Sequence, residues 1–177
     1  MERQAERKGP AQARSEMRDP WQKKRCCLTG PHPAFLKRTE DDIRVELENS
    51  ILKAVSEGYT TFVSGLNEGT DLWAAEIVVR LQQTRPELHL IAAIPSPDFD
   101  EEWDGKWRKS YRELLSRAEY VRVMAAALSE EALRERSEWM VRRSAKVIAL
   151  VTGHPGETGR ILKAASLRRM PVQVIRG

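Results

Sequence analysis

Apolar and polar positions along the chain are arranged in alternating blocks. From residue 26 onward, short apolar runs of strand length alternate with longer segments in which apolar residues recur at helical spacing. This pattern predicts strands at residues 26–29, 59–64, 88–94, 119–124, 146–151 and 171–175. It predicts helices at residues 39–58, 70–84, 106–118, 129–143 and 158–169. Thr39 and Asp42 have the spacing of a capping box at the start of the first helix.

The regular succession of strand and helix is typical of an α/β protein. Strands separated by single helices pair in parallel, and their crossovers are right-handed. The sequence therefore predicts an open, mostly parallel, doubly wound sheet flanked by helices. A chain of 177 residues without an internal repeat has the length of one domain with a sizeable core.

The net charge of +4 comes from the start of the chain. Residues 1–25 contain eight Lys or Arg and four Asp or Glu, which leaves 22 basic and 22 acidic residues in the remainder. We expect a basic, disordered leader at residues 1–25 and a neutral folded domain at residues 26–177. The alternative role for the leader is a weak electrostatic tether to nucleic acid.

Several features predict a cytoplasmic protein without a membrane partner. No apolar run approaches the roughly 20 residues that span a bilayer. Charged residues occupy the N-terminus, where a signal peptide requires an apolar stretch. The adjacent Cys26 and Cys27 lie in an apolar run, which favours buried thiols in a reducing compartment. His32, His89 and His154 are scattered and no CxxC is present, so we expect no metal site.

The segment 64–76 carries the strongest chemical signal. An apolar strand leads into a turn with Gly65 and Gly69, and a helix follows, which is the local shape that binds phosphates in nucleotide-binding α/β proteins. Ligands of parallel sheets bind at the carboxyl ends of the strands. We therefore expect this turn to form one pocket with residues 29–32 and with the glycine-bearing turn at 153–159.

The polar residues of these loops have two interpretations each. Asp71 either stabilises the start of its helix or accepts a hydrogen bond from a ribose hydroxyl or a base amino group. Glu76 lies about 140° further round the helix, so it contacts ligand alone or holds a neighbouring loop. Thr158 caps the last helix or binds phosphate, and Arg160 faces either ligand or solvent.

The predicted ligand-binding set combines residues of all three loops. Its members are Thr29, Gly30, His32, Ser64, Gly65, Gly69, Asp71, Glu76, Gly153, Gly156, Thr158 and Arg160. Trp73 and Trp139 are candidates for the core or for base stacking. Trp103 and Trp107 follow an acidic stretch, so this segment is either a lid over the ligand or a surface loop.

Short sequence motifs along nearly the whole chain, from about Cys26 to Ile175, resemble those of a known protein family. They are Thr29-Gly30 with His32-Pro33, Ser64-Gly65 with Gly69-Thr70-Asp71-Leu72-Trp73-Ala74-Ala75-Glu76, Ile94-Pro95, Tyr111 with Leu114-Leu115, Trp139-Met140-Val141 and the turn at 153–159. Together they resemble the YpsA-like branch of the SLOG superfamily, Rossmann-like proteins related to the LOG phosphoribohydrolases and to the DNA-processing protein DprA. The resemblance implies a nucleotide or ADP-ribose-type ligand.

One departure concerns the catalytic motif of the LOG enzymes, which carry Pro-Gly-Gly-x-Gly-Thr-x-x-Glu at the third loop. Here Glu157 replaces a glycine, Arg160 replaces the threonine, and Lys163 occupies the position of the catalytic Glu. A lysine does not replace a carboxylate that stabilises an oxocarbenium-like transition state or activates water. The sequence therefore assigns no catalytic residue and leaves enzymatic activity open.

We accordingly expect a sensor or regulatory protein that binds a nucleotide-derived ligand at the carboxyl edge of the sheet. One alternative is a nucleotide-processing hydrolase with LOG-like N-glycosidic cleavage that uses Glu76 or Glu157. Another is a DprA-like nucleic-acid adaptor held through the basic leader at residues 1–25. The identity of the ligand and homo-oligomerisation are left open by the sequence.

Overall fold

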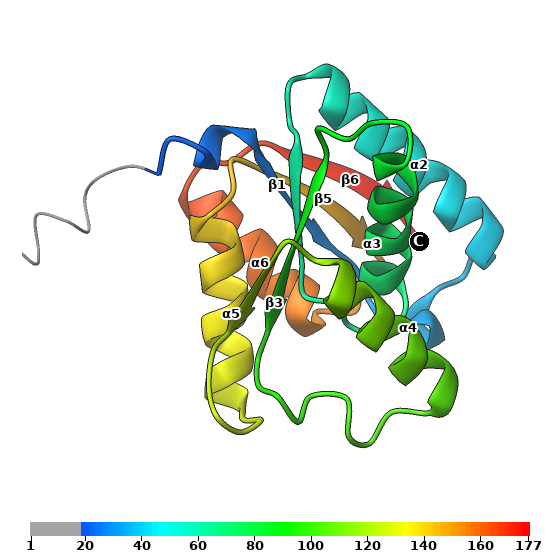
Figure 1. Cartoon of the computed structure of the whole chain (residues 1–177), viewed down its shortest axis with the longest axis vertical. Coiled ribbons are helices and arrows are strands. Elements are labelled where there is room, and N and C mark those ends of the chain that lie inside the picture. Colours follow the sequence, from blue (N-terminus) through cyan, green and yellow to red (C-terminus); the bar gives the residue numbers. More distant parts are fainter. Residues whose placement is uncertain (1–18) are drawn as a thin grey trace, which may run out of the picture.

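A computed structural model describes residues 19–177, which form one sheet with helices on both faces (Figure 1). The strands are β1 (Arg25–Thr29), β2 (Thr61–Ser64), β3 (His89–Ile94), β4 (Tyr120–Val123), β5 (Lys146–Val151) and β6 (Val172–Arg176). The α-helices are α2 (Glu40–Ser56), α3 (Thr70–Gln82), α4 (Gly105–Arg117), α5 (Glu130–Arg142) and α6 (Gly156–Leu167). Two short 3₁₀ helices, η1 (Gln22–Lys24) and η2 (Pro33–Phe35), flank β1.

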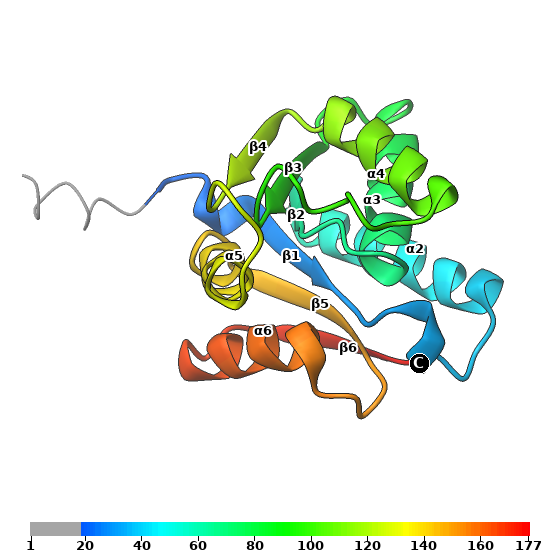
Figure 2. The same cartoon turned by 90° about the horizontal axis from the view of Figure 1, so that it is seen from below.

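The six strands follow the order β4-β3-β2-β1-β5-β6, and every neighbouring pair is parallel. Helices α2, α3 and α4 cover one face of the sheet, and α5 and α6 cover the other (Figure 2). The predicted α/β class is therefore confirmed as a single Rossmann-like, doubly wound domain. The strand order reverses between β1 and β5, and such a switch point opens a crevice at the carboxyl ends of the strands.

The core has two apolar layers, one on each face of the sheet. Residues such as Leu47 and Val78 fill the layer under α2, α3 and α4, and residues such as Met140 fill the layer under α5 and α6. The adjacent Cys26 and Cys27 point into opposite layers because side chains alternate along a strand. Both thiols are free and fully buried, as predicted, and burial raises the pKa of Cys26 to about 12.

All predicted strands and helices are present, with their ends displaced by a few residues. Thr39 caps α2 as expected, because its hydroxyl accepts a hydrogen bond from the Asp42 amide at 3.2 Å. Helix α6 begins at Gly156 rather than at residue 158. Pro155 precedes it, and its carbonyl accepts a hydrogen bond from the Gly159 amide at 2.7 Å, which extends the first turn toward the N-terminus.

The folded part includes residues 19–25, which the sequence pattern assigned to the leader. Arg25 is the first residue of β1, and its guanidinium bonds the Asp19 carboxylate. The side-chain amide of Gln22 donates a hydrogen bond to the Ser144 backbone carbonyl at 3.2 Å. Polar contacts hold this segment, so no apolar pattern reveals it. The prediction of disorder for residues 1–18 falls outside the described residues.

Among residues 19–177, no helix combines the length and the apolar character required to cross a bilayer. The same part of the chain has no group of three or more His, Cys, Asp or Glu side chains arranged to hold a metal ion.

Candidate ligand-binding site

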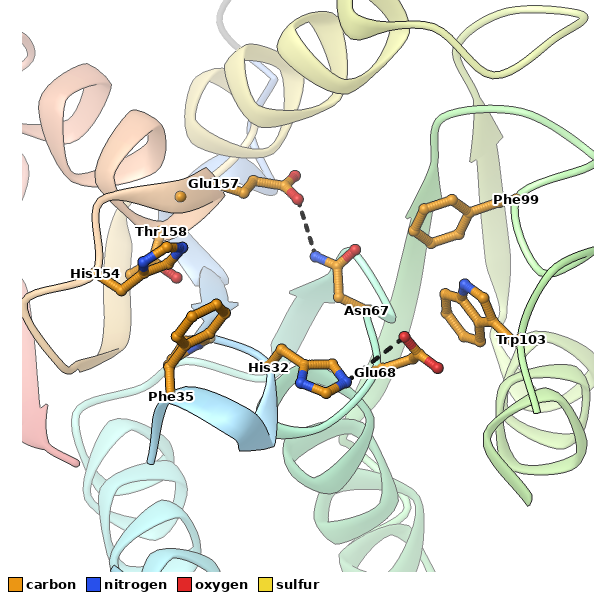
Figure 3. A pocket seen from close by; sticks show the side chains of 12 residues that line it. His32, Phe35, Asn67, Glu68, Phe99, Trp103, His154, Glu157 and Thr158 are labelled. Carbon is orange, nitrogen blue, oxygen red and sulfur yellow. Dashed lines mark hydrogen bonds and ion pairs between the residues drawn. The ribbon is translucent and has the colours of Figure 1, made fainter. Parts of the chain in front are cut away.

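A cavity of about 290 Å³ lies at the carboxyl edge of the sheet, at the β1/β5 switch point (Figure 3). The loops that follow β1, β2, β3 and β5 all contribute to it. Its lining residues are Gly30, Pro31, His32, Phe35, Asn67, Glu68, Phe99, Trp103, His154, Gly156, Glu157 and Thr158. The sequence predicted three of these four loops as parts of one pocket. The loop after β3 was considered only as a lid or a surface loop.

Two glycines allow the loop after β1 to pack against the start of α3. A Cβ atom at Gly30 would lie 2.2 Å from Cγ2 of Thr70, and one at Gly69 would lie 2.4 Å from Cδ of Pro33. Gly69 also has a φ of 90°, which a side chain disfavours. The Thr70 hydroxyl donates a hydrogen bond to the Pro31 carbonyl at 3.0 Å, which joins the two loops further. Gly30 and Gly69 are therefore required for contact between loops, whereas the sequence predicts them as members of the ligand-binding set.

Asp71 holds the loops after β1 and β2 together through hydrogen bonds. Its carboxylate accepts hydrogen bonds from the Gly30 amide and from the Asn67 side-chain amide, each at 3.0 Å. The Ser64 hydroxyl donates to the Asp71 carbonyl at 3.2 Å. Because Asp71 is buried and is not among the residues that line the cavity, it positions the loops that surround the cavity.

The second buried charge is Arg136 of α5, whose side chain is fully inaccessible to solvent. Its Nε donates to Glu157 at 3.0 Å, and its Nη2 bonds the other carboxylate oxygen of Glu157. The remaining guanidinium nitrogen donates to the Gly65 carbonyl, and Nη2 also donates to the Asn67 side-chain oxygen, both at 3.0 Å. Such a two-point contact fixes both the position and the plane of the Glu157 carboxylate.

Asn67 joins the two carboxylates into one network. Its amide nitrogen donates to both Asp71 and Glu157 at 3.0 Å, and its oxygen accepts a hydrogen bond from Arg136. Figure 3 shows the contact between Asn67 and Glu157. Burial raises the pKa of Asp71 to about 7, and the negative charge of Glu157 adds to this rise. The charge of Arg136 and the hydrogen bonds from Asn67 and Gly30 act in the opposite direction. Asp71 therefore exchanges its proton near neutral pH.

Aromatic rings form two sides of the cavity (Figure 3). On one side, the rings of Phe35 and His154 stack with their centroids 3.8 Å apart and an interplanar angle of 8°. On the other side, Phe99 and Trp103 meet edge to face at 5.0 Å. The guanidinium of Arg136 lies over the Phe99 ring at 4.9 Å. Flat aromatic walls of this kind suit a planar ring system.

The polar lining is dominated by acceptors. The carboxylates of Glu68 and Glu157 both line the cavity. Nδ1 of His32 accepts a hydrogen bond from the Ala34 backbone amide at 3.1 Å, so the ring proton is on Nε2. This Nε2 lies 3.8 Å from a carboxylate oxygen of Glu68. Burial raises the pKa of Glu68, against the lowering effect of His32. The cavity therefore favours ligand groups that donate hydrogen bonds.

The structure brings most of the predicted residues together. Four of them line the cavity, namely Gly30, His32, Gly156 and Thr158. Others lie in the supporting layer, namely Thr29, Ser64, Gly65, Gly69 and Asp71. Thr29 and Thr158 share a hydrogen bond between their hydroxyls at 3.2 Å, which joins the loops after β1 and β5.

Glu76, Arg160 and Gly153 are not brought to the cavity. Glu76 accepts hydrogen bonds from Arg44 at 2.7 Å and from the Ser110 hydroxyl at 2.6 Å, on the side of α3 that faces α2 and α4. The side chain of Arg160 is exposed and bonds Glu130 at 2.9 Å. Gly153 has a φ of 81° in the turn after β5 and lines an adjacent hollow. Of their two interpretations, Glu76 and Arg160 follow the structural one.

Sequence reasoning missed Arg136, Asn67, Glu68, Phe35 and Phe99 as site residues. A signal for Arg136 exists, because Ala132 and Met140, one helical turn to either side, are both buried. An arginine in the apolar stripe of a helix requires a buried partner. Asn67 and Glu68 lie within the segment 64–76, but neither has a pattern that distinguishes it from a solvated turn residue.

Trp103, in the loop after β3, and Trp107, in α4, have different surroundings. Trp103 lines the cavity, whereas Trp107 packs against Trp73 with ring centroids 6.2 Å apart. Trp73 itself is buried in the core. The segment before Trp103 is anchored, because the buried Asp100 accepts a hydrogen bond from Arg112 at 2.7 Å.

Comparison with known sequences decides the family. The family model of the YspA SLOG family (YpsA) matches residues 37–170. The chain belongs to this SLOG family. UPF0398 protein BH1768 of Halalkalibacterium halodurans is 30% identical over 130 residues, which cover 72% of this chain and 69% of the relative. A UPF0398 protein of Bacillus pumilus is 23% identical over 126 residues, which cover 70% and 68%. The resemblance inferred from the sequence marks is thereby confirmed.

Solved structures of DNA processing protein A share the fold of this SLOG-family protein. The protein from Helicobacter pylori, studied for its single-stranded DNA binding mode, superimposes with a TM-score of 0.56 at 17% identity over 85% of this chain. The protein from Streptococcus pneumoniae gives a TM-score of 0.57 at 17% identity over 89% of this chain. The matches span 64% and 52% of those two longer chains. At this identity the likeness concerns the fold alone.

Proposed function

We propose that the cavity binds the nucleoside part of a nucleotide or nucleotide-derived ligand, and that the protein acts as a sensor or regulator of that ligand. One observation carries the proposal: the buried Arg136 fixes the Glu157 carboxylate at the edge of a cavity with aromatic walls. The family and the switch-point location of the cavity support a nucleotide-type ligand.

The walls supply the contact with the base. Planar rings bind aromatic side chains by offset stacking or edge-to-face packing, and both Phe35 and Trp103 present rings to the cavity. The volume of about 290 Å³ is near the lower end of the range of roughly 300–1,000 Å³ for small-molecule sites. A mononucleotide therefore fits better than a dinucleotide, and an ADP-ribose-type ligand would place one half outside.

The hydrogen-bond acceptors of the cavity orient the ligand. Ribose hydroxyls and base amino groups donate hydrogen bonds, and Glu157 and Glu68 accept them. The same carboxylates repel phosphate from the interior. We place the phosphate at the rim, where His32 and His154 are exposed and where the first turn of α6 offers backbone amides.

The hydrolase alternative now rests on Glu157. Glu157 lines the cavity, whereas Glu76 is bonded to Arg44 and Ser110 elsewhere. The ion pair with Arg136 holds the Glu157 carboxylate at the cavity, and a carboxylate in such a place stabilises an oxocarbenium-like transition state. Lys163, at the position of the LOG catalytic Glu, is exposed on α6 and does not line the cavity.

The experiment that tests the proposal combines a binding screen with a reaction assay. A thermal-shift panel of nucleosides, mononucleotides, dinucleotides and ADP-ribose derivatives should show stabilisation by a nucleoside or mononucleotide. Incubation of the same compound with the protein, followed by chromatography, should return it intact. Release of free base would replace the sensor by the hydrolase, and an absence of any stabilisation would contradict both.

The DprA-like adaptor differs from both in its dependence on the leader. Because residues 19–25 belong to the fold, the truncation that tests it should remove residues 1–18 only. Loss of single-stranded DNA binding on this truncation would favour the adaptor, and unchanged binding would refute the tethering role of the leader. The buried free thiols Cys26 and Cys27 support a reducing compartment such as the cytoplasm as the site of action.

A further inference from the structure

A second concave site lies on the α5 face of the sheet, near the amino ends of the strands. It has a volume of about 370 Å³, and we name it the arginine cleft. The guanidinium groups of Arg25, Arg122, Arg142 and Arg143 line it, together with the single carboxylate of Asp19. The lining thus carries an excess of positive charge, although the domain as a whole is nearly neutral.

The cleft forms because α5 leaves the edge strand β4 uncovered. Tyr120 and Arg122 of β4 are in register with Ile91 and Ala93 of β3, whose side chains lie in the apolar layer under α5. Tyr120 and Arg122 therefore point to the same face of the sheet, beyond the helix. Tyr120 is 50% exposed, and Trp139 on α5 lines the cleft from the other side.

The charges of the cleft are only partly neutralised. Asp19 bonds Arg25 and lies 3.7 Å from Arg143. Within the described part of the chain, neither Arg122 nor Arg142 forms an ion pair with a carboxylate, and both residues are exposed. The dipole of α5 explains a cation at Arg142, and edge-strand protection explains one at Arg122. Neither effect explains why both converge on one hollow with two aromatic rings.

We propose that the arginine cleft binds single-stranded nucleic acid, with backbone phosphates on Arg122 and Arg142 and a base stacked on Tyr120. Guanidinium groups bind phosphate oxygens with two parallel hydrogen bonds, and exposed aromatic rings next to them stack bases without regard to sequence. The cleft opens on the edge of the sheet, so a single-stranded nucleic acid can lie along it without bending into an enclosed pocket. This site is separate from the nucleotide cavity, which lies at the opposite ends of the strands.

The test is fluorescence anisotropy with a labelled oligothymidylate of roughly 20 nucleotides, longer than the stretch that one small domain covers. The wild-type chain should bind it, and Arg122→Glu/Arg142→Glu should weaken binding by at least about tenfold. Loss of two phosphate contacts should also lower the slope of log affinity against log salt by about 1.4. Tyr120→Leu should weaken binding by about fivefold or more through the lost stacking.

The control is Lys109→Glu, which changes the charge by as much as each single Arg→Glu substitution does, at an exposed position of α4 on the opposite face. It should alter affinity by less than about threefold, because solvent screens charges at that distance. If Arg122→Glu/Arg142→Glu unfolds, as judged by circular dichroism, the neutral pair Arg122→Gln/Arg142→Gln replaces it.

Three results of the anisotropy measurements on the wild type and its variants would overturn the proposal. The first is failure of the wild-type chain to bind the oligonucleotide, and the second is an equal loss of affinity in Lys109→Glu and in the double substitution. The third is loss of all binding on removal of residues 1–18 while the double substitution leaves the affinity unchanged. Thymidine monophosphate at a matched nucleotide concentration should not displace the oligonucleotide. Full displacement would indicate a site for single phosphates and would equally reject the extended strand.

Discussion

Arg136 and Glu157 form a two-point ion pair between a fully buried position of α5 and the first turn of α6. Around this pair, Asn67 and Gly65 bring in the loop after β2, and Phe99 brings in the loop after β3. A single guanidinium therefore contacts three of the four loops that line the cavity. The pair determines both the shape of the cavity and the orientation of the one carboxylate that Arg136 holds at its edge.

Replacement of Arg136 by methionine should destabilise the protein by about 3–5 kcal/mol, because the Glu157 carboxylate loses its buried ion-pair partner and Asp71 loses a nearby positive charge. Urea denaturation measures the free energy of unfolding. The double variant Arg136→Met/Glu157→Gln should recover at least about 1 kcal/mol of the loss. The matched control is Arg134→Met on the exposed face of α5, which should leave stability close to that of the wild type. Equal stability of the single and double Arg136 variants would contradict the role assigned to the pair.

Gly30→Ala should destabilise the protein by roughly 1–3 kcal/mol, because the new Cβ would lie 2.2 Å from the Thr70 side chain. Gly159→Ala is the control inside α6, where the nearest atom is 3.8 Å away. It should leave stability unchanged or raise it by about 0.4–1 kcal/mol. Thermal unfolding followed by circular dichroism compares the two, and a Gly30→Ala variant as stable as the wild type would show that the loops can separate.

Asp71 should make stability depend on pH in a characteristic direction. Its pKa is raised from 3.8 to about 7 in the folded state. Between these values the folded protein holds a proton that the unfolded chain has released, so the free energy of unfolding falls as the pH rises from about 4 to about 7. The slope reaches at most about 1.4 kcal/mol per pH unit. Asp71→Asn should lack this fall, as urea denaturation at about pH 5 and about pH 7.5 would reveal. If the free energy of unfolding changed with pH in the same way in the wild type and the variant, Asp71 would not be the source of the pH dependence.

The fold was predictable because each element carries its own pattern. Strands such as β5 are continuous apolar runs, as strands buried on both faces must be, and the helices between them are amphipathic. The location of ligand sites at the carboxyl ends of parallel strands also predicts that the loops after β1, β2 and β5 lie together. The segment at residues 19–25 was not predictable in this way, since hydrogen bonds rather than apolar contacts hold it.

The site was predictable in its location but less so in its chemistry. The pattern around Gly30 and Gly69 marked a tight turn correctly, but it does not distinguish a glycine that admits a ligand from one that admits a neighbouring loop. The role of Arg136 depends on partners in three loops distant in sequence. Glu76 illustrates the converse, because its position round the helix already separated it from Asp71 and the structure pairs it with Arg44.

Glu157 is proposed to accept hydrogen bonds from the ligand in the cavity, and isothermal titration calorimetry measures its contribution to binding. The nucleoside or mononucleotide that stabilises the protein most is titrated into the wild type, Glu157→Gln and Glu76→Gln. Loss of a charged acceptor should weaken binding to Glu157→Gln by about tenfold or more, while Glu76→Gln, which keeps its partners outside the cavity, should bind within about twofold of the wild type. Wild-type affinity in Glu157→Gln, or a loss confined to Glu76→Gln, would contradict the claim.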